Sequence, residues 1–263
     1  MGHELIILEG AISVLSAVYS EYAEVVKIIL REEHAGATRG PAHKILRAAR
    51  TKNIEIAYGF AGCANIGRTH GGVIALARKR RFSEPADLLA KAQAVAVIEG
   101  VEDPYNLGYA VRALYTQGAD GLILPERDFG LSESVIEKAS TGTFYKMPAA
   151  TFKSGAKPEL VRLLKTAGFR VYCVNHKAPA GSRAELSDIF DVKFAEKSAF
   201  IIGGEKRGIS RDFLLNADEI IRLPYANAFA HSLAAQTAAT IVAYELHRQR
   251  RARASQRVPP VRR

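Results

Sequence analysis

Three segments of the chain combine residue types and positions from which a ligand site could be built. The first, residues 98–124, ends a predicted strand at Gly100 and then opens a helix that Asp103 can cap. Asn106 lies at the start of this helix, beside exposed N–H groups and the positive end of the dipole, and Arg112 lies mid-helix. A capped helix with an ordinary surface arginine would explain the same pattern.

The second segment, residues 199–210, reads as a buried strand that ends in a glycine-rich turn. Gly203 and Gly204 close the strand, and Glu205 and Gly208 follow. Glycines after a strand allow the backbone to approach a ligand. The spacing matches neither a dinucleotide fingerprint nor a Walker A loop, so a tight strand–helix turn explains it equally well.

The third segment, residues 219–249, contains a strand that ends at Leu223-Pro224, then a polar loop and a long Ala-rich helix. Ser232 or His231 could cap that helix, and Leu233 follows them. The alternative is a well-packed C-terminal helix. Small residues that permit close approach of backbone or ligand come next: Ala234, Ala235, Thr237, Ala238 and Ala239.

The sequence lacks the motifs of several other enzyme classes. The chain has no GxSxG, HExxH or CxxC motif. No metal site is expected, because the histidines are scattered along the sequence: His34, His43, His70 and His176. Cys63 and Cys173 cannot form a disulfide framework, and we expect reduced, mostly buried thiols in a cytoplasmic protein. The aromatic residues that could stack on the rings of a ligand, or simply fill the core, are Phe129, Phe144, Tyr145 and Phe229.

An α/β architecture must position these segments. Residues 94–249 alternate short β-branched runs with amphipathic helical stretches, which predicts a mainly parallel sheet covered on both faces. Residues 1–80 form a separate small α/β unit, and 81–93 form a linker with a short helix that Ser83 could cap. In the small unit we expect helices near 10–19 and 40–53, and strands at 24–30, at 54–60 and after Gly71-Gly72.

Composition and charge narrow the class of protein. The 263 residues are 48% hydrophobic and 24% charged, which is typical of a globular protein and excludes disordered, collagen-like and disulfide-scaffold classes. We expect no membrane span and no signal peptide. The net charge is +10, and the seven arginines of residues 247–263 leave +3 for the rest. Residues 250–263 are expected to form a basic, disordered tail, and the overall charge suits either a polyanionic partner or solubility alone.

Taken together, the three segments resemble the signature motifs of the TrmH (SpoU) branch of the SPOUT methyltransferases. The resemblance rests on an Asn–Gly–Arg segment, a Gly–Gly–Glu–Gly turn and a Leu-Pro…Ser-Leu segment that enters the last helix. Residues 137–148 also resemble the family's stretch between the first two motifs, and residues 1–80 resemble the RNA-binding domain often fused before the catalytic one. The motif residues are Asn106, Gly108, Arg112, Gly203, Gly204, Glu205, Gly208, Leu223, Pro224, Ser232 and Leu233.

The resemblance implies a C-terminal α/β domain with a deep trefoil knot, an exception to unknotted topology. It further implies a homodimer, bound S-adenosylmethionine and 2′-O-methylation of a ribose in RNA, with ribosomal RNA favoured over tRNA. Arg112 would clamp the phosphate next to the ribose, since a pKa above 12 makes arginine a poor base. Asn106 and Glu205 would orient Arg112 and the ribose, and Ser232 would support the hydroxyl. The cofactor would contact Thr141, Gly142, Gly203, Gly204, Leu223, Ser232 and Leu233.

The last motif departs from the family pattern. Ala234 stands where Asn is usual, Tyr225 replaces the usual Met, and the loop is one residue longer. Asn227 or His231 could supply the missing side chain. A catalytically impaired RNA-binding protein on the same fold, or a tRNA methyltransferase, is therefore an alternative. A Rossmann-type oxidoreductase is disfavoured because the dinucleotide fingerprint is missing.

Overall fold

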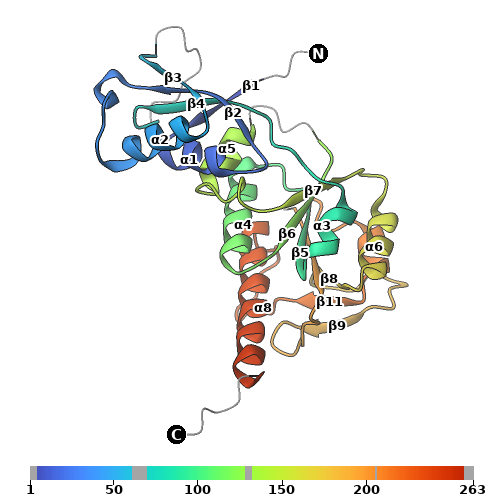
Figure 1. The fold of residues 1–263 in the computed structure, drawn as a ribbon. Helices are drawn as coiled ribbons and strands as arrows, with labels where there is room; N and C mark the ends of the chain where they lie inside the picture. The colour runs from blue at the N-terminus through green and yellow to red at the C-terminus, as the bar shows by residue number, and fades with distance from the viewer. Residues whose placement is uncertain (1–4, 61–69, 128–131, 205, 258–263) are drawn as a thin grey trace, which may run out of the picture.

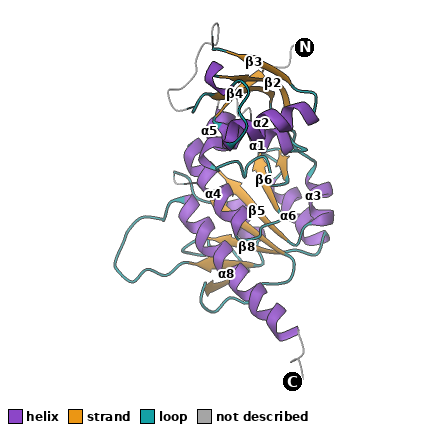
Figure 2. Ribbon diagram, turned by 60° about the vertical axis from the view of Figure 1, so that its left-hand side comes forward, coloured by secondary structure: helices purple, strands orange, loops and turns teal. Residues whose placement is uncertain are grey.

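The computed structural model of the chain describes residues 5–60, 70–127, 132–204 and 206–257. They form a small N-terminal unit around one sheet and a larger C-terminal unit around a second sheet (Figure 1). The strand order is β1-β4-β2-β3 in the first sheet and β7-β6-β5-β10-β8-β11-β9 in the second. The long helix α8 runs along the C-terminal unit to its end (Figure 2).

The N-terminal unit confirms the predicted helices and strands and adds one strand. Its elements are β1 (Leu5–Glu9), α1 (Ala11–Tyr19), β2 (Glu24–Leu30), η1 (Glu32–His34), α2 (Gly40–Thr51), β3 (Glu55–Tyr58) and β4 (Val73–Arg78). The sequence analysis did not predict β1. It pairs antiparallel with β4 and buries alternate residues, Ile6 and Leu8, in the core of the unit.

The C-terminal unit has the predicted parallel sheet. Its elements are α3 (Pro85–Lys91), β5 (Ala94–Glu99), α4 (Pro104–Thr116), β6 (Gly121–Pro125), α5 (Ser132–Ala139), β7 (Ala149–Phe152), α6 (Lys157–Thr166), β8 (Arg170–Val174), β9 (Glu185–Asp188), β10 (Ser198–Gly203), α7 (Arg211–Asn216), β11 (Glu219–Arg222) and α8 (Ala235–Arg257). Every described pairing within this sheet is parallel.

Helices cover both faces of this sheet, as the continuous apolar runs predicted. On one face, Val95 and Val97 of β5 pack in a core with residues of α3, α6 and α7. On the other, Ala96 and Ile98 pack with residues of α4, α5 and α8. Successive side chains of a strand point to opposite faces, so a strand buried on both faces must be apolar throughout.

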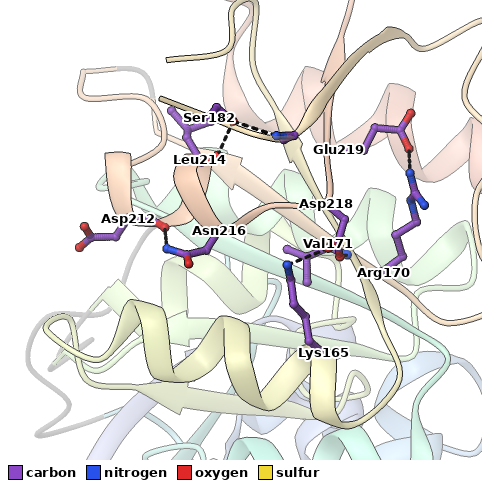
Figure 3. Close-up of polar contacts among 10 residues, drawn as sticks. Lys165, Arg170, Val171, Ser182, Asp212, Leu214, Asn216, Asp218 and Glu219 are labelled. Atoms are coloured by element: carbon purple, nitrogen blue, oxygen red, sulfur yellow. Dashed lines mark hydrogen bonds and ion pairs between the residues drawn. The ribbon is translucent and has the colours of Figure 1, made fainter. Parts of the chain in front are cut away.

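Polar contacts join β8 to β11 at the far side of the sheet (Figure 3). The Asp218 carboxylate accepts the Val171 N–H at 2.8 Å and pairs with Lys165 at 2.7 Å. Arg170 donates to Glu219 at 2.9 Å. These contacts fix the register of β11, whose carboxyl end carries the third motif.

A buried polar cluster joins the two units. The Arg80 guanidinium donates to the Met147 carbonyl and lies over the rings of Tyr22, Phe82 and Phe144. Close by, the Tyr145 hydroxyl donates to Glu133 at 2.6 Å. Phe144 and Tyr145 are fully buried, so they are core residues.

Three details differ from the sequence predictions. Ser83 does not cap α3; its N–H donates to the Ala149 carbonyl, because the segment before α3 joins the edge of the sheet. Helix α8 begins at Ala235, so neither Ser232 nor His231 caps it. The helix also continues through residues 250–257, where a disordered tail was expected. Arg250 and Arg253 there donate to backbone carbonyls of the domain, which holds this end of the helix in place.

The remaining residues of that tail, 258–263, lie outside the described residues, as do Cys63 and Phe129. Cys173 is a free, buried thiol, and burial raises its pKa above the ordinary value. Among the helices in the described parts of the chain, none is long and apolar enough to cross a membrane.

Candidate ligand-binding site

A cavity opens where the carboxyl ends of β8, β10 and β11 meet. In parallel α/β sheets this edge is where ligands bind. The loops after three neighbouring strands and the start of α8 surround the cavity, and its walls are polar and apolar in about equal measure. Its lining residues are Val174, Asn175, His176, Ile202, Gly203, Gly204, Gly208, Ile209, Leu223, Tyr225, Ser232, Leu233, Ala235 and Ala238.

The glycines of the second motif allow strand ends to pack backbone against backbone. A Cβ on Gly204 would lie 2.0 Å from the Gly100 carbonyl oxygen, and one on Gly203 would lie 2.3 Å from the Gly208 backbone. The Gly208 N–H donates to the Gly204 carbonyl at 2.9 Å and closes the turn. Only glycine fits at both positions, so the motif shapes the floor of the cavity.

Ion pairs hold the loops next to this turn. Lys206 pairs with Glu102 at 2.7 Å, which links the loop after β10 to the loop after β5. The hydrogen bond from Lys206 lowers the pKa of Glu102. Glu99 at the end of β5 pairs with Lys157 at 2.9 Å and accepts the Ser210 N–H at 2.9 Å.

Tyr225 reaches across the cavity. Its hydroxyl lies 2.9 Å from Nε2 of His176 and accepts the Leu233 N–H at 3.0 Å. The two rings meet edge to face, with centroids 4.9 Å apart. The phenol therefore joins the end of β8 to the loop after β11. Phe229, further along that loop, is exposed and packs against Tyr225 and His231.

The structure brings together five of the predicted cofactor residues: Gly203, Gly204, Leu223, Ser232 and Leu233 all line this cavity. It does not bring Thr141 and Gly142 there. Their turn packs on α1, where a Cβ on Gly142 would lie 2.1 Å from the Ser16 hydroxyl. The reason is topological, since the loop after α5 faces the N-terminal unit.

The first motif lies on α4. As predicted, the Asp103 carboxylate caps this helix by accepting the Asn106 N–H at 2.9 Å. Arg112 is exposed two turns later and does not line the cavity. Tyr105 and Tyr109 share its helix face and are about half exposed. Glu205, the remaining predicted catalytic residue, lies outside the described residues.

Sequence reasoning did not predict three polar side chains of the cavity: Asn175, His176 and Tyr225. Asn175 and His176 come directly after β8, and a polar residue directly after a parallel strand was the available signal. Tyr225 was noted only as a departure from the family pattern. Neither Asn227 nor His231 lines the cavity in place of the missing amide.

The residues that line the cavity suit a ligand with an apolar ring and a few polar atoms. Leu223, Leu233 and Ile209 supply apolar walls, and the strand-end loops supply backbone groups. The enclosed volume is about 60 Å³ with Tyr225 across it, whereas small-molecule pockets usually measure roughly 300–1,000 Å³. Among the described residues, no group of three or more His, Cys, Asp or Glu could hold a metal ion.

The fold and cavity define an α/β protein with a ligand pocket at the carboxyl edge of a parallel sheet. The chain belongs to the SpoU rRNA methylase family, whose model matches residues 93–244. That match covers the three motifs and most of the C-terminal unit, which confirms the family resemblance seen in the sequence.

Curated relatives agree with this assignment, and a solved structure shares the fold. A Staphylococcus haemolyticus protein described as a TrmH family tRNA/rRNA methyltransferase is 32% identical over 157 residues, 59% of each chain. A Staphylococcus epidermidis protein of the same description is 27% identical and aligns over 94% of this chain and 97% of its own. The fold matches the AdoMet-bound rRNA methyltransferase of Sinorhizobium meliloti with a TM-score of 0.73 and 20% identity, over 93% of this chain and 87% of that one.

Proposed function

We propose that this chain transfers a methyl group from S-adenosylmethionine to the 2′-hydroxyl of a ribose in RNA, with ribosomal RNA the favoured substrate. The observation that supports this proposal is the cavity at the ends of β8, β10 and β11, which gathers Gly203, Leu223, Ser232 and Leu233 from two separate motifs. The AdoMet-bound structure of the Sinorhizobium meliloti protein, which shares the fold, supports the choice of cofactor.

When bound, S-adenosylmethionine supplies an electrophilic methyl group. The residues of this chain must then bind the cofactor, align the ribose hydroxyl and stabilise the charges around it. Leu223 and Leu233 would enclose the apolar part of the cofactor, and Ser232, exposed at the rim, would hydrogen-bond the ribose hydroxyl. Thr141 and Gly142 have no part in this scheme, because Gly142 packs against α1 and Thr141 lines a different cavity.

Arg112 would act as a phosphate clamp next to the reacting ribose. The guanidinium is exposed and forms no hydrogen bond or ion pair with the residues that the structure describes. Asn106 on the same helix, together with Glu205, would orient it. A fixed cation that binds an RNA phosphate needs no change of protonation, which suits arginine better than the role of a base.

A homodimer would complete the site, because Arg112 lies outside the cavity of its own chain. The helices α4 and α8 pack together, and each has exposed large apolar side chains: Tyr105, Tyr109, Ile241 and Tyr244. Such a patch is typical of an interface. Light scattering should give twice the chain mass, and Tyr109→Asp should shift the protein toward the monomer.

Methyl transfer tests the proposal. Labelled S-adenosylmethionine should label ribosomal RNA, and Arg112→Ala should abolish the labelling without lowering cofactor affinity. Arg162→Ala on α6, an exposed arginine on the opposite face of the sheet, should keep full activity. A folded dimer that binds the cofactor yet labels neither ribosomal RNA nor tRNA would exclude the enzyme, and labelling of tRNA alone would exclude the ribosomal substrate.

A second candidate is an RNA-binding protein that has lost catalysis. Two observations favour it. Ala234 stands where the family usually has Asn, and the Tyr225 hydroxyl accepts the Leu233 N–H, which is then not available to a cofactor. Calorimetry separates the two, because a chain that does not bind S-adenosylmethionine cannot be the enzyme.

A further inference from the structure

A second cavity, of about 660 Å³, lies between the N-terminal unit and the turn after α5. It shares no residue with the cavity at the ends of β8, β10 and β11. Residues of α1, α2 and the loop before β4 line one side, and Lys138 and Thr141 of the C-terminal unit line the other. Both units therefore contribute to it.

Two helices begin at this cavity, and neither start has a side-chain cap. Helix α1 follows Gly10 and helix α2 follows Arg39, and no side chain hydrogen-bonds the first N–H groups of either. Gly10–Ser13 and Arg39, Pro41 and Ala42 all line the cavity. Each start of a helix carries a partial positive charge, so two of them favour an anion in the space between.

The Ser13 hydroxyl is an independent sign of a ligand. Ser13 is only 4% exposed and lines the cavity, yet its hydroxyl forms no hydrogen bond with any residue of the described chain. The Ser13 oxygen is not among the fully buried side-chain atoms of the described residues that lack a partner, so it is open to the cavity and can donate to a ligand there. An anion at the start of α1 would accept this hydrogen bond together with those of the neighbouring N–H groups.

The formal charges at the cavity favour an anion too. Lys138 lies 3.2 Å from the Glu9 carboxylate, which balances the acidic side chain of the lining. Arg39 is exposed and makes no polar contact with the described residues, so its charge remains available. His34 and His70 also line the cavity and face backbone groups of Gly71 and Gly72.

We propose that this second cavity binds a backbone phosphate of the RNA substrate, held by Arg39, Ser13 and the starts of α1 and α2. The proposal rests on the proposed function, since it gives that RNA a second contact beyond the methyl-transfer site. A phosphodiester of a chain is favoured over a free phosphate by the surface beside the cavity. Ile12 and Tyr19 are 58% and 66% exposed along α1, where an unpaired base can stack.

Binding of a fluorescein-labelled, short single-stranded RNA, followed by anisotropy at several salt concentrations, tests this site. Ser13→Asp places a carboxylate at the third residue of α1, where it complements the helix dipole and repels phosphate. It should weaken RNA binding about tenfold while the melting temperature stays or rises. Arg39→Gln should weaken binding similarly and lower the salt slope by about one.

The matched control is Arg50→Gln, which removes the same charge from the opposite end of α2. It should bind RNA within about twofold of the unchanged chain. All variants should keep their affinity for S-adenosylmethionine, because none touches the first cavity.

The outcomes are distinct. If the unchanged chain binds RNA and both cavity variants bind it equally well, the phosphate site is wrong while the proposed function stands. If the unchanged chain binds no RNA, the proposed function itself fails. The last experiment is a competition in which inorganic phosphate is added to the RNA complex at constant ionic strength. Displacement of RNA by low millimolar phosphate would show a site for a free phosphate and overturn the assignment to the RNA backbone.

Discussion

Tyr225 should weaken cofactor binding, because its phenol crosses the cavity that we assign to S-adenosylmethionine. The hydroxyl accepts the Leu233 N–H at 3.0 Å and lies 2.9 Å from His176 Nε2. About 60 Å³ remains enclosed, far below the roughly 300 Å³ at the lower end for small-molecule pockets. A cofactor that enters this cavity must therefore displace the phenol and break both hydrogen bonds.

The magnitude follows from those two bonds. Each contributes about 0.5–1.5 kcal/mol net, so together they oppose binding by about 1–3 kcal/mol. Tyr225→Phe removes both bonds and keeps the ring, and the Kd for S-adenosylmethionine should fall about 5–150-fold. Tyr225→Ala also removes the ring from the cavity and should bind at least as tightly as the Phe variant.

Isothermal titration calorimetry with S-adenosylmethionine measures the effect directly. Tyr58→Phe is the control, because Tyr58 is an exposed tyrosine on β3 in the other unit. Its affinity should equal that of the unchanged chain. If Tyr225→Phe binds the cofactor equally or more weakly, the phenol contacts the ligand and does not compete with it, and the reasoning is refuted.

Three further predictions concern stability and RNA binding. Burial raises the pKa of Glu137 to about 8, so the folded state holds a proton that the unfolded state loses above its ordinary value of 4.5. The free energy of unfolding should therefore fall between pH 4.5 and 8, by at most about 5 kcal/mol. In urea titrations, Glu137→Gln should remove most of that fall. If the variant kept the same pH dependence, the raised pKa of Glu137 would be wrong. Gly204→Ala should destabilise the protein by about 3 kcal/mol, because its Cβ would meet backbone, whereas Gly155→Ala in open space should have little effect on the melting temperature. Equal melting temperatures would show that the strand ends can separate. Deleting 258–263 removes two arginines and should reduce RNA affinity and its salt dependence while cofactor affinity stays unchanged. Equal RNA affinity would show that these arginines do not contact RNA.

Periodicity in the sequence predicted most of the architecture. Continuous β-branched runs between amphipathic stretches indicated a parallel sheet with helices on both faces. The structure confirms it, since alternate residues of β5 pack into separate cores on the two faces of the sheet. Local chemistry was equally readable at Asp103, whose side chain caps α4. Ser83 shows the limit of such local signals, since pairing with the sheet edge overrides its capping tendency.

The sequence by itself determined which segments carry the site, because glycine pairs and polar residues that follow strands can be recognised from residue type and position alone. Only the tertiary structure decided which of them meet. It brought Leu223 and Leu233 to Gly203, and it placed Thr141 and Gly142 against α1. It also revealed that Tyr225 crosses one cavity and that Ser13 lines another without a hydrogen-bond partner among the described residues. The physical reason is that such contacts join residues far apart in the chain, and no local pattern encodes which strand ends and helix starts will face one another.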